Sequence, residues 1–275
     1  MTNQKIILIS GATGGLGLKL IKEFLIKKEG ILRCLVKNYQ DIPQLLTEKD
    51  IDIAKGDLED FDSLKRACQN VDFIVHLAAV THTNREDLYY KINTLGTKNL
   101  IDATPGTTEK FIYISTCAVG SGGGAYSNSK MLAENYLIES RIPYIILRPS
   151  EIYGISQAGM VEKLISFLKK MPVIPMIGKG DYKLAPVYVN DVVNAIVKSM
   201  HLDKEKAIYN LAGPEIMTYN QLIDCLCSNL QIKRIKLKIP PLLLKLIVSF
   251  MARLFSDSFI YKDQIPRFLL EKDYD

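Results

Sequence analysis

The sequence predicts an α/β fold: a doubly wound parallel sheet accompanied by a smaller C-terminal lobe. Short apolar, β-branched runs alternate with amphipathic stretches of helical length through the first 150 residues. A glycine-rich turn joins the first run to the first helix, and the regular alternation of strands and helices ends after Arg148-Pro149. Apolar strands separated by amphipathic helices are typical of a parallel sheet covered on both faces. We therefore expect a ligand to bind at the carboxyl ends of the strands.

The elements follow one another in a regular order. Strands are expected at Ile6–Ile9, Ile31–Lys37, Ile51–Ala54, Asp72–Leu77, Lys110–Thr116, Pro143–Leu147 and Val187–Val189. Helices are expected at Leu18–Lys28, Ser63–Asn70, Arg85–Ala103, Tyr126–Glu139, Met160–Lys170 and Asp191–Met200. The segments 207–211, 218–229 and 237 onward are expected to build the smaller part. This order predicts a sheet domain of residues 1–150 and 187–201, and a substrate lobe of residues 151–186 and 202–275.

Composition excludes several classes of protein. The chain has 275 residues, of which 48% are apolar and 24% charged, as in ordinary globular proteins. A net charge of +5, with no basic run interleaved with aromatic residues, does not favour a nucleic-acid partner. Five scattered cysteines indicate a reducing, cytoplasmic setting, and with three histidines no metal site is expected. No uncharged apolar run reaches the roughly 18 residues of a membrane span.

The glycine-rich turn predicts binding of a dinucleotide. Glycines at 11, 14 and 17 stand between a strand and a helix. Such a turn needs residues without Cβ where the chain reverses and where a phosphate approaches the backbone. The free N–H groups and positive dipole end of the helix favour a pyrophosphate. The alternative is a turn that binds nothing, but strand and helix lie where the motif requires them. The expected contacts are Gly11, Thr13, Gly14, Gly15, Leu16 and Gly17.

The end of the second strand favours NADP over NAD. An acidic residue there binds the adenosine ribose of NAD, whereas a basic residue accommodates a 2′-phosphate. This chain has Lys37 at that position, and Arg33 shares its face by strand alternation. NAD remains an alternative, because a lysine at a strand end is also commonly just solvated. Asp57, after the third strand, is equally consistent with an adenine contact and with a helix N-cap.

A tyrosine and a lysine supply the candidate chemistry. Tyr126 and Lys130 are four residues apart on a predicted helix and share a face. An ammonium beside a phenol favours the phenolate and lowers a pKa that starts near ~10. A phenol tuned in this way can pass a proton to or from a substrate oxygen. Thr116, at the end of the fifth strand, is placed to hold the same oxygen. The pair alone is weak evidence; its position after that strand gives it weight.

Together, the motifs resemble the extended short-chain dehydrogenase/reductases, the NAD-dependent epimerase/dehydratases, which have a Rossmann-type fold. The matching motifs, in family order, are Gly11-x-x-Gly14-x-x-Gly17, Gly56-Asp57-Leu58, His76-Leu77-Ala78-Ala79, Asn93 with Gly96-Thr97, Ile114-Ser115-Thr116, Tyr126-x-x-x-Lys130, Arg148-Pro149-x-x-Ile152-Tyr153-Gly154 and Pro186-Val187-Tyr188-Val189-x-Asp191.

The resemblance implies a role for each matching residue. Tyr126 would be the acid/base, Lys130 would tune it and bind the nicotinamide ribose, and Thr116 would orient the substrate oxygen. Further cofactor contacts would come from Asp57, Leu58, Ala78, Ala79, Asn93, Pro149 and Ile152. The residues expected to line the substrate pocket are Thr81, His82, Glu151 and Tyr153.

The expected activity is hydride transfer on a nucleotide-linked or lipid-linked sugar. The short loop of residues 121–124 and the basic residue at 37 depart from the usual pattern of sugar epimerases. A ketone or aldehyde reductase of the hydroxysteroid or flavonoid type is therefore an alternative. A non-catalytic NAD(P)-binding regulator or assembly subunit is a second alternative, which the presence of Thr116, Tyr126 and Lys130 together disfavours.

Two further expectations concern partners. Residues 242–255 place Lys245, Ser249 and Arg253 on one stripe of an otherwise apolar segment. As a helix, this segment would either pack on the lobe or lie on an anionic membrane surface, which suits a lipid-linked substrate. Many members of the family pair through the helices after the fourth and fifth strands, so a homodimer is compatible with the resemblance.

Overall fold

A computed structural model describes residues 4–38, 51–155, 159–244 and 262–274. Its centre is a seven-stranded sheet in the order β11-β6-β5-β4-β1-β2-β3. All six strand pairings in it are parallel. The strand order reverses between β1 and β4, and ligands bind at such a switch point in open α/β sheets. The predicted doubly wound parallel sheet is confirmed.

The sheet domain contains the following elements, in chain order. They are β1 (Ile6–Ser10), α1 (Gly15–Lys27), β2 (Ile31–Val36), β3 (Ile51–Lys55), α2 (Phe61–Ala67), β4 (Phe73–His76), α3 (Glu86–Leu88), η3 (Tyr89–Gly96), α4 (Thr97–Ala103), β5 (Lys110–Ile114), α5 (Gly124–Glu139), β6 (Tyr144–Pro149), α7 (Val189–His201) and β11 (Lys206–Leu211). The predicted helix at 85–103 is one run of α3, η3 and α4, with π-helical geometry in the middle.

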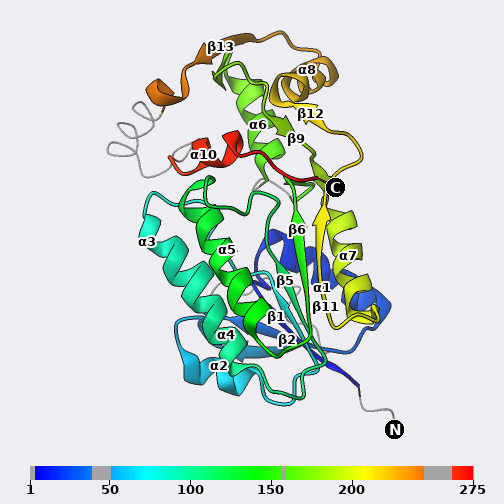
Figure 1. Cartoon of the computed structure of the whole chain (residues 1–275). Helices are drawn as coiled ribbons and strands as arrows, with labels where there is room; N and C mark the ends of the chain where they lie inside the picture. Colours follow the sequence, from blue (N-terminus) through cyan, green and yellow to red (C-terminus); the bar gives the residue numbers. More distant parts are fainter. Residues whose placement is uncertain (1–3, 39–50, 156–158, 245–261, 275) are drawn as a thin grey trace.

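Helices cover both faces of the sheet, with α2, α4 and α5 on one side and α1 and α7 on the other (Figure 1). On the α1 and α7 side the core contains Ile9, Phe24 and Ile196, which are at most 1% exposed. On the opposite side it contains Leu8 and Ile146, both fully buried. Burial on both faces explains why the strands are continuously apolar, since neither face meets water.

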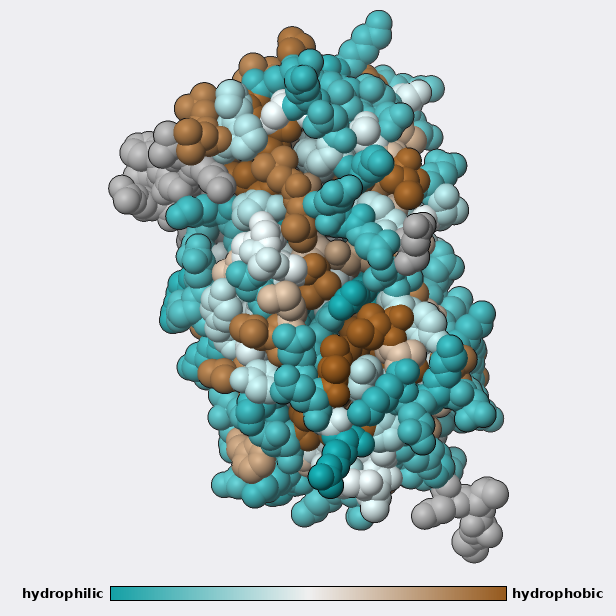
Figure 2. Space-filling view, in the orientation of Figure 1, coloured by the Kyte–Doolittle hydropathy of each residue, from teal (hydrophilic) through white to brown (hydrophobic). Residues whose placement is uncertain are grey.

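The remaining elements form a smaller lobe beyond the carboxyl ends of the strands (Figure 1). They are β7 (Ile152–Tyr153), α6 (Met160–Lys170), β8 (Val173–Ile177), β9 (Lys183–Leu184), β10 (Val187–Tyr188), β12 (Met217–Thr218), α8 (Tyr219–Asn229), β13 (Ile235–Ile239) and α10 (Gln264–Leu269). Its core packs α6, β8 and α8 around Leu164, Ile174 and Ile223. Figure 2 shows hydrophobic surface at the top of the view, where β13 lies in Figure 1.

The structure corrects one boundary and leaves one prediction outside its range. Residues 202–275 were expected in the smaller lobe, but Lys206–Leu211 pairs with β6 as the outermost strand of the large sheet. The segment 242–255, expected as a helix that packs on the lobe or lies on a membrane surface, falls almost entirely outside the described residues. Within the part of the chain that the structure describes, none of the helices combines the length and the apolar character that crossing a membrane requires.

Candidate active site

The glycine turn closes tightly between β1 and α1, at the switch point of the sheet. Gly11 has φ of +72°, and a Cβ on it would lie 2.7 Å from the backbone nitrogen of Ala78, which follows β4. A Cβ on Gly17 would lie 2.3 Å from the carbonyl oxygen of Gly11. The first glycine thus permits the reversal next to β4, and the last lets the helix pack on the turn. The predicted strand–turn–helix unit is present as expected.

A cavity of about 400 Å³ lies between this turn, the ends of β5 and β6, and α10. Predicted cofactor and catalytic residues that line it are Gly11, Gly14, Gly15, Leu16, Gly17, Ala79, Thr116, Tyr126, Lys130, Pro149 and Ile152. The turn and the candidate acid/base therefore border one space, although the first glycine and Tyr126 are more than a hundred residues apart in the chain. The residues fit a dinucleotide, because the glycine turn borders the cavity where α1 begins, and the free N–H groups at a helix start favour a pyrophosphate.

Tyr126 lies in the first turn of α5 and is only 8% exposed. Burial raises the pKa of its phenol; the positive charge of Arg267 and a hydrogen bond with Thr116 oppose that rise, and the Asp263 carboxylate adds to it. The tyrosine ring meets the ring of Tyr89 edge-on, with 5.8 Å between centroids. Thr116 lies where the sequence analysis expected it, within reach of the phenol.

Lys130 is 2% exposed and lies one helical turn beyond Tyr126. Its ammonium donates a 2.7 Å hydrogen bond to the carbonyl of Ile114 and lies 4.1 Å from the ring centroid of Tyr113. Burial lowers the pKa of Lys130 to about 7, although Glu134 opposes this. The prediction that Lys130 lowers the pKa of Tyr126 is not met in this structure: the phenol's pKa is raised, and the cation acting on it is Arg267.

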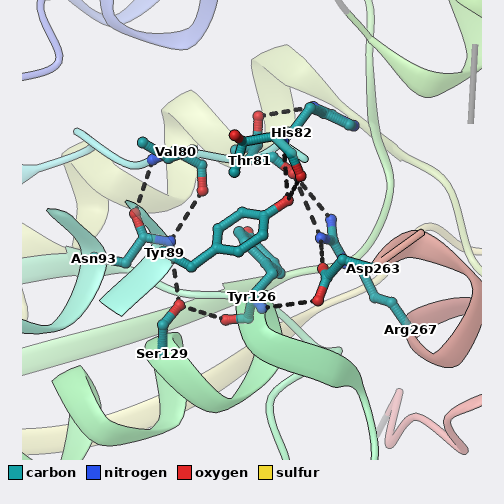
Figure 3. A network of polar contacts seen from close by, with 10 residues as sticks. Val80, Thr81, His82, Tyr89, Asn93, Tyr126, Ser129, Asp263 and Arg267 are labelled. Carbon is teal, nitrogen blue, oxygen red and sulfur yellow. Dashed lines mark hydrogen bonds and ion pairs between the residues drawn. The ribbon is translucent and has the colours of Figure 1, made fainter. Parts of the chain in front are cut away.

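Asn93 holds the backbone that follows β4 rather than lining the cavity. Its side chain accepts a 2.8 Å hydrogen bond from the N–H of Val80 and donates a 2.9 Å bond to the carbonyl of the same residue (Figure 3). It also donates to the hydroxyl of Ser129 on α5 at 3.2 Å. Asn93 therefore fixes the segment between β4 and α3 against α5. Other predicted cofactor contacts that lie outside the lining of this cavity are Thr13, Arg33, Lys37, Asp57, Leu58 and Ala78.

A second cavity, of about 550 Å³, lies at the ends of β2 and β3. Lys37 and Asp57 both line it and form an ion pair of 2.6 Å. The hydrogen bond to Asp57 raises the pKa of Lys37. For Asp57, burial pushes the pKa up, but the bond and charge of Lys37 and the backbone N–H groups of Leu58 and Glu59 together outweigh it, and the pKa is lowered. The two residues predicted at the adenosine end of the cofactor are thus brought together.

Arg33 does not reach this cavity, contrary to the prediction. Its guanidinium is paired with Asp52 at 2.7 Å and donates to the carbonyls of Ala67 and Gln69, after α2. Arg33 and Lys37 were expected on the same face of the strand. Four residues of extended strand span about 13 Å, however, so the two positions are about that far apart. Strand alternation predicts which face of the sheet a side chain lies on, but it does not predict which neighbouring residues a long side chain contacts.

Three of the four predicted substrate residues line the central cavity, namely Thr81, His82 and Glu151. Burial lowers the pKa of His82 to about 4, and the charges of Lys163 and Arg267 lower it further. Tyr153 is the exception: it is 37% exposed and packs against Tyr188, with ring centroids 5.4 Å apart. The prediction for Tyr153 is wrong because β7 turns that side chain outward.

Sequence reasoning missed the contribution of the last described segment. Its residues at the cavity are Gln264, Arg267, Phe268 and Lys272. The guanidinium carbon of Arg267 lies 3.8 Å from the ring centroid of Tyr126. Lys272 forms a buried ion pair of 2.5 Å with Glu151. One sequence signal in this segment was an acid and a base four residues apart, Asp263 and Arg267, which form an ion pair of 2.6 Å.

The sheet order and the glycine turn are those of the extended short-chain dehydrogenase/reductases, and the phenol of Tyr126 lies in the cavity beside that turn. The sequence profile of the NAD dependent epimerase/dehydratase family matches residues 7–212. The chain therefore belongs to this family, and the predicted resemblance is confirmed.

Individual relatives are distant. The chain is 27% identical over 70% of its length to the UDP-glucose 4-epimerase of Vibrio cholerae. It is 24% identical over 71% of its length to a 3 beta-hydroxysteroid dehydrogenase/Delta 5-->4-isomerase of Mycobacterium tuberculosis. It covers 66% and 60% of the lengths of these two relatives, so it spans no more than about two thirds of either. A crystal structure of UDP-glucuronic acid 4-epimerase from Bacillus cereus, in complex with UDP-glucuronic acid and NAD, superposes with a TM-score of 0.73. That match has 21% identity and covers 84% of this chain and 85% of that one, so it shows the shared fold.

Proposed function

We propose that this protein moves a hydride between NAD(P) and a sugar carbon of a nucleotide-linked or lipid-linked sugar, with Tyr126 as the acid/base. The observation that carries the proposal is the convergence of the glycine turn, Thr116, Tyr126 and Lys130 on one cavity of about 400 Å³. The relatives whose names specify nucleotide sugars support the substrate class.

Each residue of the site has a defined task in this proposal. NAD(P), when bound, accepts or returns the hydride. As the sugar C–H bond breaks, Tyr126 as phenolate takes the proton of the hydroxyl on the same carbon, leaving a ketone. Thr116 orients that oxygen. Lys130 offers a buried donor to the same cavity, since the carbonyl of Ile114 accepts only one of its three N–H groups.

The preference for NADP is part of the proposal. Lys37 lies at the end of β2, where a 2′-phosphate would be recognised, and further cations, Lys55 and Arg66, line the same cavity. The ammonium of Lys37 is paired with the carboxylate of Asp57, so a phosphate would have to compete with that carboxylate for the ammonium. Cations outnumber carboxylates by one at this cavity, which supports NADP without excluding NAD as a cofactor.

The test is to incubate the purified protein with NAD or NADP and with UDP-glucose, UDP-glucuronic acid or dTDP-glucose. Proton NMR of the sugar and absorbance of the reduced nicotinamide would be followed. We expect an altered sugar or a keto intermediate with at least one substrate. Tyr126→Phe should reduce the rate by about 10²- to 10⁴-fold, whereas Tyr136→Phe, on the same helix but outside the cavity lining, should retain it. Equal rates for the two variants would overturn the role of Tyr126.

A second candidate function is reduction of an apolar ketone. The central cavity shares His82, Met160, Gln264 and Phe268 with a smaller cavity, which is lined mostly by hydrophobic and aromatic residues, among them Leu164, Ile177 and Tyr182. These walls favour a ring system over a charged diphosphate, and the hydroxysteroid dehydrogenase relative is consistent with that. Consumption of NADPH with a 3-ketosteroid, and none of the sugar reactions above, would favour this candidate. Unchanged biological activity in Tyr126→Phe would favour a non-catalytic binding role instead.

We also propose that two copies pair through the helices after β4 and β5. Leu95 on η3, and Leu132 and Ile138 on α5, are 52%, 39% and 38% exposed. Apolar side chains of this size on neighbouring helices are typical of a protein interface. Light scattering should give twice the chain mass, and Leu132→Glu should return it to the mass of one chain.

A further inference from the structure

The residues after 262 fold back onto the amino end of α5 and form part of the site. Asp263 accepts a 3.2 Å hydrogen bond from the backbone N–H of Tyr126. A Cβ on Gly124, where φ is +87°, would lie only 2.5 Å from the same carboxylate. At the other end of this segment, Lys272 is held by Glu151. The segment is thus fixed to the site at two points, and the glycine makes room for the first of them.

Arg267 bridges this segment and the ring of Tyr126. Its guanidinium carbon is 3.8 Å from the ring centroid, and Nη2 is 2.6 Å from the Asp263 carboxylate. Nη1 and Nη2 also lie 3.4 Å from the carbonyl of Thr81, on the segment after β4 (Figure 3). The side chains of Arg267 and Asp263 are 13% and 3% exposed, so water screens their charges weakly.

We propose that Arg267 is a positioning residue for Tyr126: stacked on the ring and anchored by Asp263, it fixes the phenol in the cavity and favours its ionised form. The inference rests on the proposed acid/base role of Tyr126 and adds a source for its activation. The π face of a ring attracts a cation, and a phenolate ring attracts it more strongly than a neutral phenol. Lys130 is turned towards Ile114 and Tyr113, so Arg267 supplies the cation that the neighbouring lysine was expected to supply.

Other groups face Tyr126 from each element around it. Thr116 from the loop after β5 stabilises the phenolate by a hydrogen bond, whereas Asp263 opposes ionisation. Tyr89 on η3 is itself held neutral, because burial raises its pKa. His82, from the loop after β4, is uncharged at neutral pH, since its pKa is lowered to about 4. Of these groups, only Arg267 brings a full positive charge onto the ring.

The test measures ionisation of Tyr126 directly, without a substrate. A fluorotyrosine is incorporated at position 126 alone, and its ¹⁹F shift is titrated against pH in the cofactor-free protein. We expect Arg267→Gln to reduce the phenolate fraction at a fixed pH by about tenfold, one pKa unit. We expect Arg267→Lys, which keeps the positive charge, to retain most of it.

Retention in Arg267→Lys separates electrostatics from loosened packing, because both variants lose the stacked guanidinium but only Arg267→Gln loses the positive charge. Arg85→Gln is the matched control, since Arg85 forms an exposed ion pair of 2.9 Å with Asp87 and is not among the groups that act on the phenol, and it should leave the titration unchanged. If Arg267→Gln does not fold, Arg267→Met is compared with Arg267→Lys in the same way. A phenolate fraction that is unchanged in Arg267→Gln, or lowered equally in Arg267→Gln and Arg267→Lys, would overturn the inference. A correct titration without any sugar or ketone turnover would instead count against the proposed function.

Discussion

The sheet domain and the smaller lobe differ in how completely their strands are buried. Every residue of β4 and β5 is buried, because helices cover both faces of the large sheet. In the lobe, β13 pairs with β8 alone among the described strands, and Ile235 and Leu237 are 68% and 52% exposed. A strand buried on both faces permits few substitutions, whereas a half-exposed strand permits many. The domain that holds the cofactor elements is therefore rigidly specified, and the lobe that would recognise the substrate is free to vary.

The first prediction breaks the sheet domain at its most constrained point. Gly11→Val forces a β-branched residue to φ of +72° and places side-chain atoms against the backbone of Ala78. Backbone strain and overpacking together should destabilise the protein by about 2 to 5 kcal/mol. Affinity for NAD and NADP should fall at least about 100-fold, which is about 2.7 kcal/mol. Urea unfolding and calorimetric titration measure the two effects.

Gly106→Val is the control, because no heavy atom lies within 4 Å of a Cβ at that glycine and its φ is not positive. We expect wild-type binding from it. Cofactor binding that survives in Gly11→Val would mean that the turn between β1 and α1 is not the phosphate site.

The second prediction compares equivalent cavities in the two parts. Ile146 in β6 and Ile223 in α8 are both fully buried, so truncating either to alanine should cost about 2 to 5 kcal/mol locally. Ile146→Ala should lower the cooperative unfolding transition of the whole chain. Ile223→Ala should mainly increase hydrogen exchange in α6 and α8, because the lobe has its own core.

Native-state hydrogen exchange distinguishes the two outcomes. Equal loss of protection in β4 and β5 for both variants would show that the sheet domain and the lobe unfold as one unit. The prediction that the lobe core unfolds separately would then be wrong.

The third prediction concerns Lys130, the buried cation of the sheet domain. Its pKa is lowered to about 7 in the folded protein from an ordinary value of 10.5. Between these values the unfolded chain binds a proton that the folded chain has lost, so stability rises with pH across this window. Below about pH 7 both states are protonated, and the cost of burying the charge is felt in full. Lys130→Met should therefore be stabilised relative to wild type most strongly near pH 7, with the difference shrinking by up to about 1.4 kcal/mol per pH unit above it.

Urea unfolding at several pH values between 7 and 10 gives this difference directly. Lys65→Met, an exposed lysine of α2, controls for the loss of one positive charge. A stability difference that does not depend on pH would mean that Lys130 keeps its proton in the folded protein.

The difference in burial between the sheet domain and the smaller lobe explains which elements could be predicted from the sequence. The strands of the large sheet were predicted because burial on both faces leaves continuous apolar runs. Lys206–Leu211 was assigned to the wrong part because, as the outermost strand, it is only partly buried and shows no such run. The strand–turn–helix motif was predicted because its three parts follow one another directly in the sequence, from Ile6 to Lys27. Arg267 was missed because the segment that carries it meets α5 across 137 residues of sequence, from Asp263 to Tyr126, and no local pattern encodes that contact.

The smallest effect is expected at the adenosine end, where the sheet domain alone lines the cavity. Lys37→Gln should weaken NADP binding about tenfold, which is about 1.4 kcal/mol, by removing one charged contact to the 2′-phosphate. Affinity for NAD should hardly change, because NAD has no charged group there. Lys55→Gln, at the same cavity, is the control and should change the ratio of the two affinities less. An unaltered ratio in Lys37→Gln would leave the preference for NADP without its main support, and the end of β2 would then be a solvated edge rather than a cofactor contact.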